Sequence, residues 1–437
     1  MKRSAIHDWA SVIIVQALVA ALASCPALAR TWNISPAGTG DAPTIQAGID
    51  SAAAGDTVLL EAGTYTGSGN RDVFFNGKAI VLRGGCDPMD CVIDCEGSLS
   101  EPHGAFRFYP ADSASALECV TIQGAWLSVG AVYCGGGSPT IRDCVLQQNQ
   151  CDGDGGAITV GSFSALTVIG CEFRENSAAG NGGAISVYGG AELVASNCLF
   201  SDNSTSGGGG AVGANDAEVV IDSCVFCSNT AAIASGALDF REGAHIITNC
   251  RFLRNSAQSC GAAVFSMCNV AMAYCVSNMN RAAFNTASML FYDCSASIAN
   301  CTFSADSTGF FFDNVLRFET GTPPVVTNTV IAFGRNCRAI GCVNTSSNPS
   351  LTCCDIYGNS GGDWVDCIAG LGGAAGNFSA DPKFCSIATD YLCVEDCSPC
   401  LAGGNTCGVD VGAMGAGCAC GEATEPTTWG RIKASYR

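Results

Sequence analysis

One cysteine recurs along the chain at nearly constant spacing, and this periodicity limits the fold more than any other feature. The interval is 25 to 27 residues over the series Cys119, Cys144, Cys171, Cys198, Cys224, Cys250, Cys275 and Cys301. Five residues after most of these cysteines stands an asparagine, namely Asn149, Asn176, Asn203, Asn229, Asn255 and Asn280, and Asp306 closes that series. A fixed period in this range indicates a solenoid of stacked units, in which each unit contacts only its neighbours.

Other positions of the repeat are apolar in unit after unit. Fourteen residues after the cysteine the column reads Ile158, Ile185, Val212, Leu238, Val264, Met289 and Val315. Two residues after it stand Phe173, Phe200, Phe226 and Phe252. A short strand with one apolar face cannot bury that face alone, whereas coils stacked about 4.8 Å apart build a continuous core. We therefore predict an all-β fold, a single-stranded right-handed parallel β-helix solenoid with about 26 residues and three short strands per coil.

Asparagine and glycine mark the corners of each coil. Asparagine tolerates a left-handed backbone, and its amide can hydrogen-bond to the next asparagine along the stack, so the asparagine column predicts a ladder. A second corner is predicted at the pairs Gly155-Gly156, Gly182-Gly183 and Gly209-Gly210, where a positive φ costs nothing. The leucine-rich repeat is an alternative at this period, but the units are rich in Gly and poor in Leu.

The start of the repeat region carries its own signals. Residues Ala42 to Ala54 suit a helix, with Ile45 and Ile49 four apart, and predict an N-terminal helical cap over the open end of the solenoid. The order of this helix, then Gly55 to Leu59, Gly63 to Tyr65, Gly77 to Ile80 and Val92 to Asp94, resembles the opening of pectin-lyase-like β-helix proteins. The elements Phe173 to Asn176 and Gly182 to Ile185 resemble the repeats of chlamydial polymorphic outer membrane proteins. Both resemblances imply a fold rather than an activity.

Composition divides the chain into four parts. Residues 1–29 have the features of a signal peptide: two basic residues, an apolar run and the small-x-small site Ala27-Leu28-Ala29. Residues 30–376 are predicted to form the β-helix with its N-terminal cap, and residues 377–420 form Cys-rich C-terminal coils or a cap. Residues 421–437 are a basic tail, interpreted as frayed chain or a sorting tag.

The N-terminus predicts a bacterial protein that is secreted or lies at the cell surface. The alternative is a lipoprotein, because Leu22-Ala23-Ser24-Cys25 resembles a bacterial lipobox that would place a lipid on Cys25. No later stretch approaches 18 continuous apolar residues, so no transmembrane segment is predicted. The 30 cysteines fit an oxidising compartment.

Net charge limits the partners. The formal charge is −19, or −20 without the first 29 residues, which carry Lys2, Arg3 and Asp8. Nucleic acid is disfavoured, because phosphate neutralisation needs clustered Lys and Arg, and a polyanionic sugar would be repelled unless a cation bridged it. A glycan or a surface protein is the predicted partner of a monomer.

Candidate catalytic residues are few. Pectin-lyase-like enzymes act through carboxylates stacked on neighbouring coils, yet no column here holds three acids, and the column fifteen after the cysteine reads Thr159, Ser186, Gly213 and Asp239. Asp239 with Arg241 is the best catalytic candidate, and a solvated strand face is the commoner explanation of that pair. We interpret Asp152-Gly153-Asp154-Gly155 as a turn and His245 as a buried structural ring. No metal site and no cofactor are predicted, with Ca²⁺ as the alternative.

The function predicted from these observations is non-catalytic: adhesion, glycan binding or a structural role. Trp126 and Tyr188 are candidate glycan-binding aromatic residues. The alternative is a polysaccharide lyase or glycoside hydrolase of the pectin-lyase-like superfamily.

Two cysteine populations are predicted. The ladder residues Cys144, Cys171, Cys198, Cys224 and Cys250 are expected to be buried thiols, because in-register Cβ vectors run parallel and do not converge. The disulfide candidates lie in loops and in the C-terminal region, namely Cys86, Cys91, Cys385, Cys393, Cys400 and Cys407. Cys86 with Cys91 and Cys400 with Cys407 are the local pairs expected first, although sequence does not determine connectivity.

Overall fold

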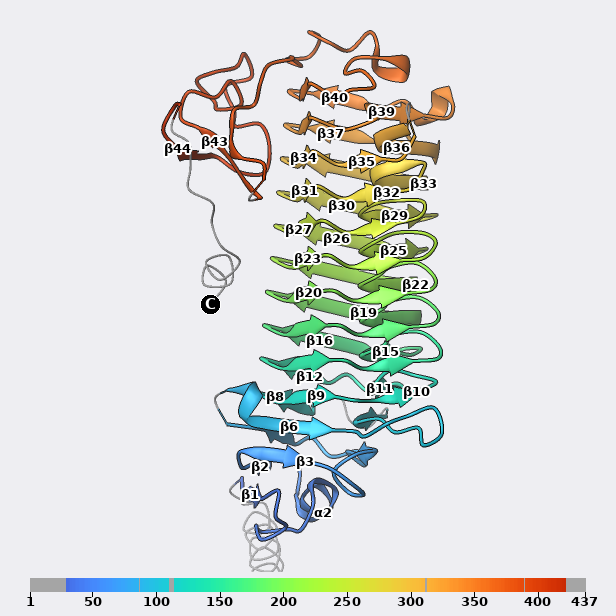
Figure 1. Ribbon diagram of the computed structural model, residues 1–437, viewed down its shortest axis with the longest axis vertical. Helices are drawn as coiled ribbons and strands as arrows, with labels where there is room; N and C mark the ends of the chain where they lie inside the picture. The colour runs from blue at the N-terminus through green and yellow to red at the C-terminus, as the bar shows by residue number, and fades with distance from the viewer. Residues whose placement is uncertain (1–28, 86, 110–113, 311–312, 389, 422–437) are drawn as a thin grey trace, which may run out of the picture.

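The chain forms one elongated stack of coils (Figure 1). The computed structural model describes residues 29–85, 87–109, 114–310, 313–388 and 390–421, so the predicted signal peptide with Cys25, the candidate Cys86 and the basic tail from residue 422 lie outside the described residues. Neighbouring coils pair in parallel and in register from β1 (Thr31–Ile34) to β41 (Asp355–Tyr357). The predicted all-β parallel β-solenoid with a repeat of about 26 residues is confirmed.

Two long sheets run along most of the stack, and a third runs along its middle coils, from β10 (Trp126–Leu127) to β35 (Ser307–Thr308). The first has 21 strands: β1, β2 (Thr57–Leu60), β4 (Val73–Phe74), β5 (Val81–Arg83), β7 (Phe106–Phe108), β8 (Ala116–Glu118), β11 (Val132–Cys134), β12 (Thr140–Arg142), β15 (Ile158–Val160), β16 (Ala165–Ile169), β19 (Ile185–Ser196), β22 (Val212–Asp222), β25 (Leu238–Arg241), β26 (Ala244–Thr248), β29 (Ala263–Ser266), β30 (Asn269–Ala273), β33 (Thr286–Ala299), β36 (Asp313–Gly321), β37 (Val325–Thr327), β39 (Cys337–Cys342) and β40 (Ser350–Thr352).

The second sheet has 12 strands: β3 (Gly63–Tyr65), β6 (Cys91–Asp94), β9 (Thr121–Gln123), β13 (Val145–Gln147), β17 (Glu172–Arg174), β20 (Leu199–Ser201), β23 (Val225–Cys227), β27 (Arg251–Leu253), β31 (Val276–Asn278), β34 (Thr302–Ser304), β38 (Val330–Ala332) and β41. The third has eight two-residue strands: β10 (Trp126–Leu127), β14 (Gln150–Cys151), β18 (Ser177–Ala178), β21 (Ser204–Thr205), β24 (Thr230–Ala231), β28 (Ser256–Ala257), β32 (Arg281–Ala282) and β35 (Ser307–Thr308).

Each regular coil has four paired segments, not the predicted three. In one coil β17 and β18 are followed by β19, which pairs along its length with both β15 and β16 of the coil before. The additional segment is the two-residue strand of the third sheet. It was missed because two residues are too short to show an apolar period.

The apolar column shifts by one residue after Leu238. Leu238 pairs with Ala263, and Met289 pairs with Leu316, so Val264 and Val315 do not belong to that column as predicted. At Val264 the reason is that the coil after Cys250 is one residue shorter, and a one-residue slip turns a strand side chain to the opposite face. Val264 therefore pairs with Asp239 on the outer face of the sheet. At Val315 the step from Met289 to its partner Leu316 is one residue longer than the step from Ala263 to Met289.

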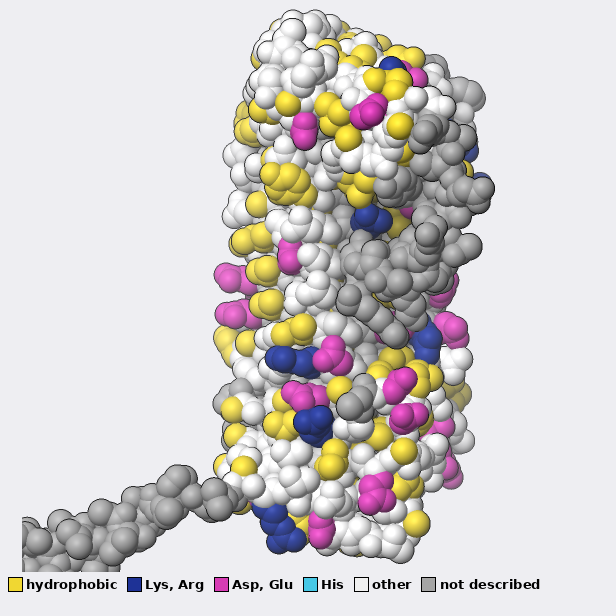
Figure 2. Space-filling model, turned by 90° about the vertical axis from the view of Figure 1, so that its left-hand side faces the viewer, with side chains coloured by type: hydrophobic (Ala, Val, Ile, Leu, Met, Phe, Trp, Pro, Cys, Tyr) yellow, Lys and Arg dark blue, Asp and Glu magenta, His cyan; other side chains and the backbone are white. Residues whose placement is uncertain are grey.

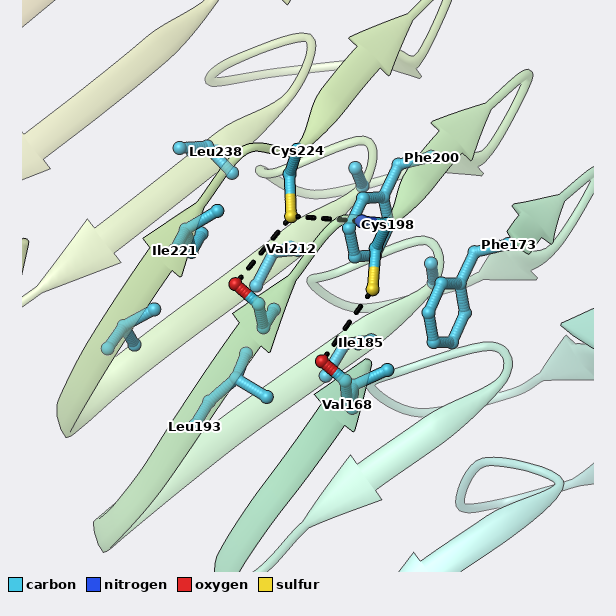
Figure 3. Packing of buried hydrophobic residues seen from close by; sticks show 14 of the residues in the cluster. Val168, Phe173, Ile185, Leu193, Cys198, Phe200, Val212, Ile221, Cys224 and Leu238 are labelled. Atoms are coloured by element: carbon cyan, nitrogen blue, oxygen red, sulfur yellow. Dashed lines mark hydrogen bonds between the residues drawn. The ribbon is translucent and has the colours of Figure 1, made fainter. Parts of the chain in front are cut away.

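Aromatic rings and thiols stack inside the solenoid (Figure 3). The rings of Phe173, Phe200, Phe226 and Phe252 lie nearly parallel, with successive centroids 4.7 to 5.1 Å apart. The five ladder cysteines are at most 2% exposed and are free thiols, as predicted. Cys198, for example, donates its S–H toward the carbonyls of Ser196 (3.2 Å) and Val168 (3.7 Å). Burial raises the pKa of the Cys171, Cys224 and Cys250 thiols, which makes them poor nucleophiles.

The predicted asparagine ladder is present, but the left-handed residues are their neighbours. Asn176 donates from Nδ2 to Oδ1 of Asn203 over 3.0 Å, and the same bond recurs from Asn149 to Asp306. The ladder asparagines are fully buried, and positive φ belongs to the residue before each, such as Glu175 (φ 55°) and Asp202 (φ 56°). The chain therefore turns at the residue before each asparagine, and the asparagine side chain is buried in the core. The glycine corner has the predicted positive φ at Gly155, Gly182 and Gly209.

The two ends of the stack differ. The helix predicted at Ala42 to Ala54 is the shorter α2 (Ile45–Ser51), which begins after the N-cap Thr44 and places Ile45 and Ile49 in the main core. At the other end Ile368 of η3 (Asp366–Ile368) is fully buried in that core. The two other short 3₁₀ segments are η1 (Pro88–Asp90) and η2 (Thr345–Ser347).

The Cys-rich segment is not an end cap. It contains β42 (Phe384–Ser386), β43 (Tyr391–Glu395) and β44 (Ala416–Cys418), and Figure 1 shows it folded back beside the upper coils. Val394 and Val411 pack with Val330 of the second sheet. Asn278 donates to the Ile387 carbonyl (3.0 Å) and to Asp390 (2.7 Å). We call residues 378–421 the C-terminal module.

Four disulfides are present in the described residues, and all lie in the last hundred residues. They are Cys342–Cys367, Cys353–Cys407, Cys385–Cys418 and Cys397–Cys420. The predicted pair Cys400–Cys407 is wrong, because Cys407 bonds to Cys353 of the solenoid while Cys400 is a buried thiol that donates to Asp355. Cys91 is also a buried thiol, and its proposed partner Cys86 lies outside the described residues. Sequence proximity was misleading because the module folds back on earlier coils.

Candidate functional site

A hollow of about 360 Å³ lies on the outer face of the first sheet, across four successive coils. Strands β19, β22 and β25 form its floor, with corner residues of the third-sheet side at its rim. Its polar lining consists of Asp154, Asn181, Ser186, Tyr188, Asn215, Asp239 and Arg241. We call this the Asp239 hollow.

Asp239 is the least solvated of these charged groups. It is outward-facing on β25, yet only 3% exposed, and burial raises the pKa of its carboxyl. Its Oδ2 accepts from Arg241 Nη2 over a long 3.4 Å, and its buried Oδ1 has no hydrogen-bond partner among the described residues. The interpretation of Asp239 and Arg241 as a solvated strand face is therefore wrong for Asp239, while Arg241 is half exposed. A buried carboxyl oxygen without a partner is costly, which is typical of a site that binds something.

Glycines make room for the carboxyls. In register, Asp239 pairs with Gly213 on one side, and the backbone of Gly208 lies against its carboxyl. A Cβ at Gly208 would collide with Asp239 Oδ2, and a Cβ at Gly180 would collide with Asp154 Oδ1. These glycines therefore permit close approach of side chain and backbone.

The amides and the second carboxyl come from the preceding coils. Asp154 Oδ1 accepts from the backbone N–H of Asn181, and Asn181 Oδ1 accepts from the N–H of Gly208 (3.0 Å). These bonds fix the positions of both side chains on rigid corners. The predicted turn at Asp152 to Gly155 is present, and its Asp154 lines the hollow, which the sequence interpretation did not anticipate.

One aromatic side chain, Tyr188, lines the hollow. Tyr188 is half-buried, and burial and the neighbouring Tyr133 raise the pKa of its hydroxyl. Asn215 follows Tyr188 in register on β22 and is exposed. The lining thus combines two carboxyls, two amides, one guanidinium and a phenol, a set suited to a ligand with several hydroxyl or charged groups.

The remaining candidates lie elsewhere. His245 is 1% exposed in the column between Val219 and Val270, and burial lowers its pKa to about 4, so the predicted structural ring is confirmed. Trp126 donates to Asp152 (3.2 Å) at the edge of another shallow hollow, on the third sheet. In the described residues the one group of three metal-ligand side chains is Glu395, Cys397 and Cys420, and its cysteines form a disulfide.

A second polar hollow of about 450 Å³ lies near the N-terminal end, beside α2. His103 Nδ1 lies 2.7 Å from Asp72 Oδ2, and Arg71 pairs with Glu96 at 2.7 Å. Because these polar groups partner one another, we place the candidate site at the Asp239 hollow.

Comparisons with known proteins find one matching family model and several similar solved structures. The family model of the Chlamydia polymorphic membrane protein repeat matches residues 170–188. Among solved structures the chain is similar to the pectate lyase Pel9A, with 14% identity, a TM-score of 0.49 and coverage of 89% of this chain and 96% of that chain. It is also similar to a PL6 family alginate lyase, AlyGC in mutant form (10% identity, TM-score 0.40, coverage of 76% and 51%), and to a rhamnogalacturonan lyase (13%, 0.35, 74% and 84%). No curated protein matches.

The in-register parallel coils and the repeat match define a parallel β-helix repeat protein. No helix among the described residues has the length and apolar character that a membrane crossing requires. On the face drawn in Figure 2 the Lys and Arg side chains are scattered and form no patch.

Proposed function

We propose that this chain is a secreted or surface-exposed β-helix protein that binds a saccharide in the Asp239 hollow without cleaving it. The observation that carries the proposal is the buried Asp239 carboxyl, which lines an open polar hollow and whose Oδ1 has no partner in the part of the chain that the structure describes. A hydroxyl or another donor from a ligand would satisfy the carboxyl group after a small side-chain rotation. Paired strands hold the lining residues, so the site is preorganised.

The composition of the lining supports a sugar ligand. Side-chain amides and carboxyls can bond to neighbouring hydroxyls, and Tyr188 offers an aromatic edge beside them. The match to a polymorphic membrane protein repeat supports a location at the cell surface, reached through the signal peptide or, as the alternative, through a lipid on Cys25. Adhesion through the bound glycan is the simplest use of such a protein.

The spacing of the acids supports binding rather than cleavage. Pectin-lyase-like enzymes act through carboxylates stacked on neighbouring coils, whereas Asp154 and Asp239 lie three coils apart. The proposal includes no cofactor, with Ca²⁺ as the alternative.

A polysaccharide lyase or glycoside hydrolase is the second candidate. It is favoured by the burial of Asp239, which raises the pKa of the carboxyl in the direction that a general acid needs, and by Arg241 beside it. One experiment separates the two functions. The mature chain is incubated with a panel of oligosaccharides, and binding is measured together with new reducing ends and unsaturated sugar ends, with and without EDTA.

Binding without products, lost in Asp239→Asn and unaffected by EDTA, is the expected result. Product formation that this variant abolishes would replace the proposal by the second candidate. Failure of every saccharide to bind would refute both functions for this hollow.

A further inference from the structure

The charges in and around the Asp239 hollow favour one chemical class of ligand. Two carboxyl groups, Asp154 and Asp239, line it against the single guanidinium of Arg241. The exposed acids Asp216 and Glu242 follow the lining residues Asn215 and Arg241 in sequence. The chain without its first 29 residues carries −20, so its long-range field attracts cations and repels anions.

Arg241 does not neutralise the buried carboxyl fully. Its contact with Asp239 spans 3.4 Å, and its side chain is 53% exposed against 3% for Asp239. Oδ1 of Asp239 stays without a partner, while Oδ1 of Asp154 already accepts from a backbone N–H. The hollow therefore offers carboxyl oxygens as hydrogen-bond acceptors. One of them, the buried Oδ1 of Asp239, has no donor among the described residues.

We infer that the sugar unit in the Asp239 hollow carries a free amino group, as in a hexosamine oligomer that is cationic at neutral pH. This inference rests on the proposed function, because it names the ligand class of the same site. An ammonium group supplies three N–H donors and a positive charge, and both complement the Asp239 carboxyl, whose Oδ1 has no donor among the described residues. The amides of Asn181 and Asn215 and the phenol of Tyr188 are then left for the hydroxyls and the ring of the sugar.

Arg241 has a distinctive role under this inference. Its guanidinium has the same charge as the bound ammonium group, so it weakens binding of the amino sugar. It also weakens binding of simple cations in the hollow. Removal of Arg241 should therefore strengthen binding of an amino sugar, whereas it would weaken binding of a uronate. Whether the affinity rises or falls when Arg241 is removed therefore distinguishes an amino sugar from a uronate.

The test is isothermal titration calorimetry of the mature chain with three tetrasaccharides, of glucosamine, N-acetylglucosamine and galacturonate. We expect the glucosamine oligomer to bind at least about tenfold more tightly than either of the others at low salt. Asp154→Asn should lower that affinity about fivefold, and Arg241→Gln should raise it about threefold. Glu192→Gln, which removes an exposed acid of β19 outside the hollow, is the matched control and should change it less than about twofold.

Asp154 is chosen because it is only half-buried, and circular dichroism with the melting temperature confirms that each variant folds. If the acetylated or uronic oligomer binds as tightly as the amine, or if Arg241→Gln weakens amine binding, this inference fails while the proposed function stands. If no oligosaccharide binds, the proposed function fails with it. A tetralysine peptide that binds as tightly as the glucosamine tetramer and responds to the same variants would refute the saccharide class.

Discussion

Asn280 donates from its side-chain amide to Oδ1 of Asp306 over 3.0 Å, so the buried amide ladder of the solenoid ends on a carboxyl group. Ser277 and the backbone N–H of Asn280 also donate to this carboxyl, over 2.8 and 2.7 Å. Burial nevertheless raises the pKa of Asp306 to about 7. The neutral form fits the core better, because an amide ladder supplies no counter-charge.

Replacement of Asp306 by asparagine should stabilise the protein above neutral pH. In the unfolded chain the carboxyl titrates near 3.8, so between about pH 4 and 7 the folded state binds more protons, and the free energy of unfolding falls as pH rises. Asparagine continues the ladder and does not titrate. We expect Asp306→Asn to add about 1–3 kcal/mol at pH 8 and little at pH 4, as measured by urea unfolding.

The exposed acid Asp216 provides the control, because Asp216→Asn should leave the pH dependence unchanged. Some dependence will remain in Asp306→Asn, since burial also raises the pKa of Asp355 to about 7. An Asp306→Asn variant that is less stable than the parent at pH 8 would contradict this account of the ladder end.

His245 should contribute a pH dependence of opposite sign. Its folded pKa is lowered from 6.5 to about 4, so the unfolded chain binds the extra proton and stability falls as pH drops through that window. Its Nδ1 has no partner, and Nε2 lies 3.1 Å from the Glu242 carbonyl. His245→Leu, which suits the apolar column, should raise the melting temperature at pH 5 and change it little at pH 8. An equal rise at both values would assign the effect to packing alone.

The repeat predicted the fold because its core contacts are local in the stack. Each residue pairs with the residue at the same position of the next coil, so the spacing of about 26 residues determines which residues pair. Phe173, which pairs with Phe200, is an example. The predicted register failed at Val264 and at Val315, because the cysteine spacing alone cannot locate a residue that is lost or gained within a coil. The module's connectivity depends on contacts over long sequence separations, such as Cys353 with Cys407, which no periodicity encodes.

The sequence pointed to the residues of the candidate hollow only separately. It offered Asp239 and Arg241 as a catalytic candidate, Tyr188 as a glycan-binding candidate and Asp154 as part of a turn. These residues come from three different coils, and only stacking brings them to one hollow. The burial of Asp239 could not be read from its own strand, because it results from the bare backbone of Gly208 lying against the carboxyl.

Attachment of the C-terminal module should depend on Asn278. Its side chain bonds to Asp390, which is 3% exposed and also pairs with Arg254 at 2.5 Å. Asn278→Ala leaves that buried carboxylate with one partner fewer, at a cost of about 1–3 kcal/mol. We expect faster amide exchange and proteolysis within residues 378–421, with the coils below unaffected. Arg281→Ala, which changes an exposed residue on another side of the same coil, is the control. If the module is equally protected from exchange and proteolysis in both variants, the apolar contacts of Val394 and Val411 are sufficient to attach it.

The cysteines should separate into two classes by reactivity. Alkylation of the native protein, then denaturation and a second alkylating reagent, should label Cys144, Cys171, Cys198, Cys224 and Cys250 only in the second step, because they are buried. Peptide mass spectrometry without reduction should recover the four C-terminal disulfides.

The most demanding case is Cys268 and Cys294, whose sulfurs lie 3.5 Å apart on adjacent coils. We expect both to remain thiols, because a bridge would require in-register side chains to converge against the direction of the paired strands. Cys342–Cys367 spans a similar sequence distance, but it joins β39 to the irregular η3 segment, where no strand pairing opposes the bond. Recovery of Cys268 linked to Cys294, or of any two ladder peptides linked to each other, would contradict this account. It would show that in-register cysteines can form disulfides and that the core is held by covalent bonds as well as by packing.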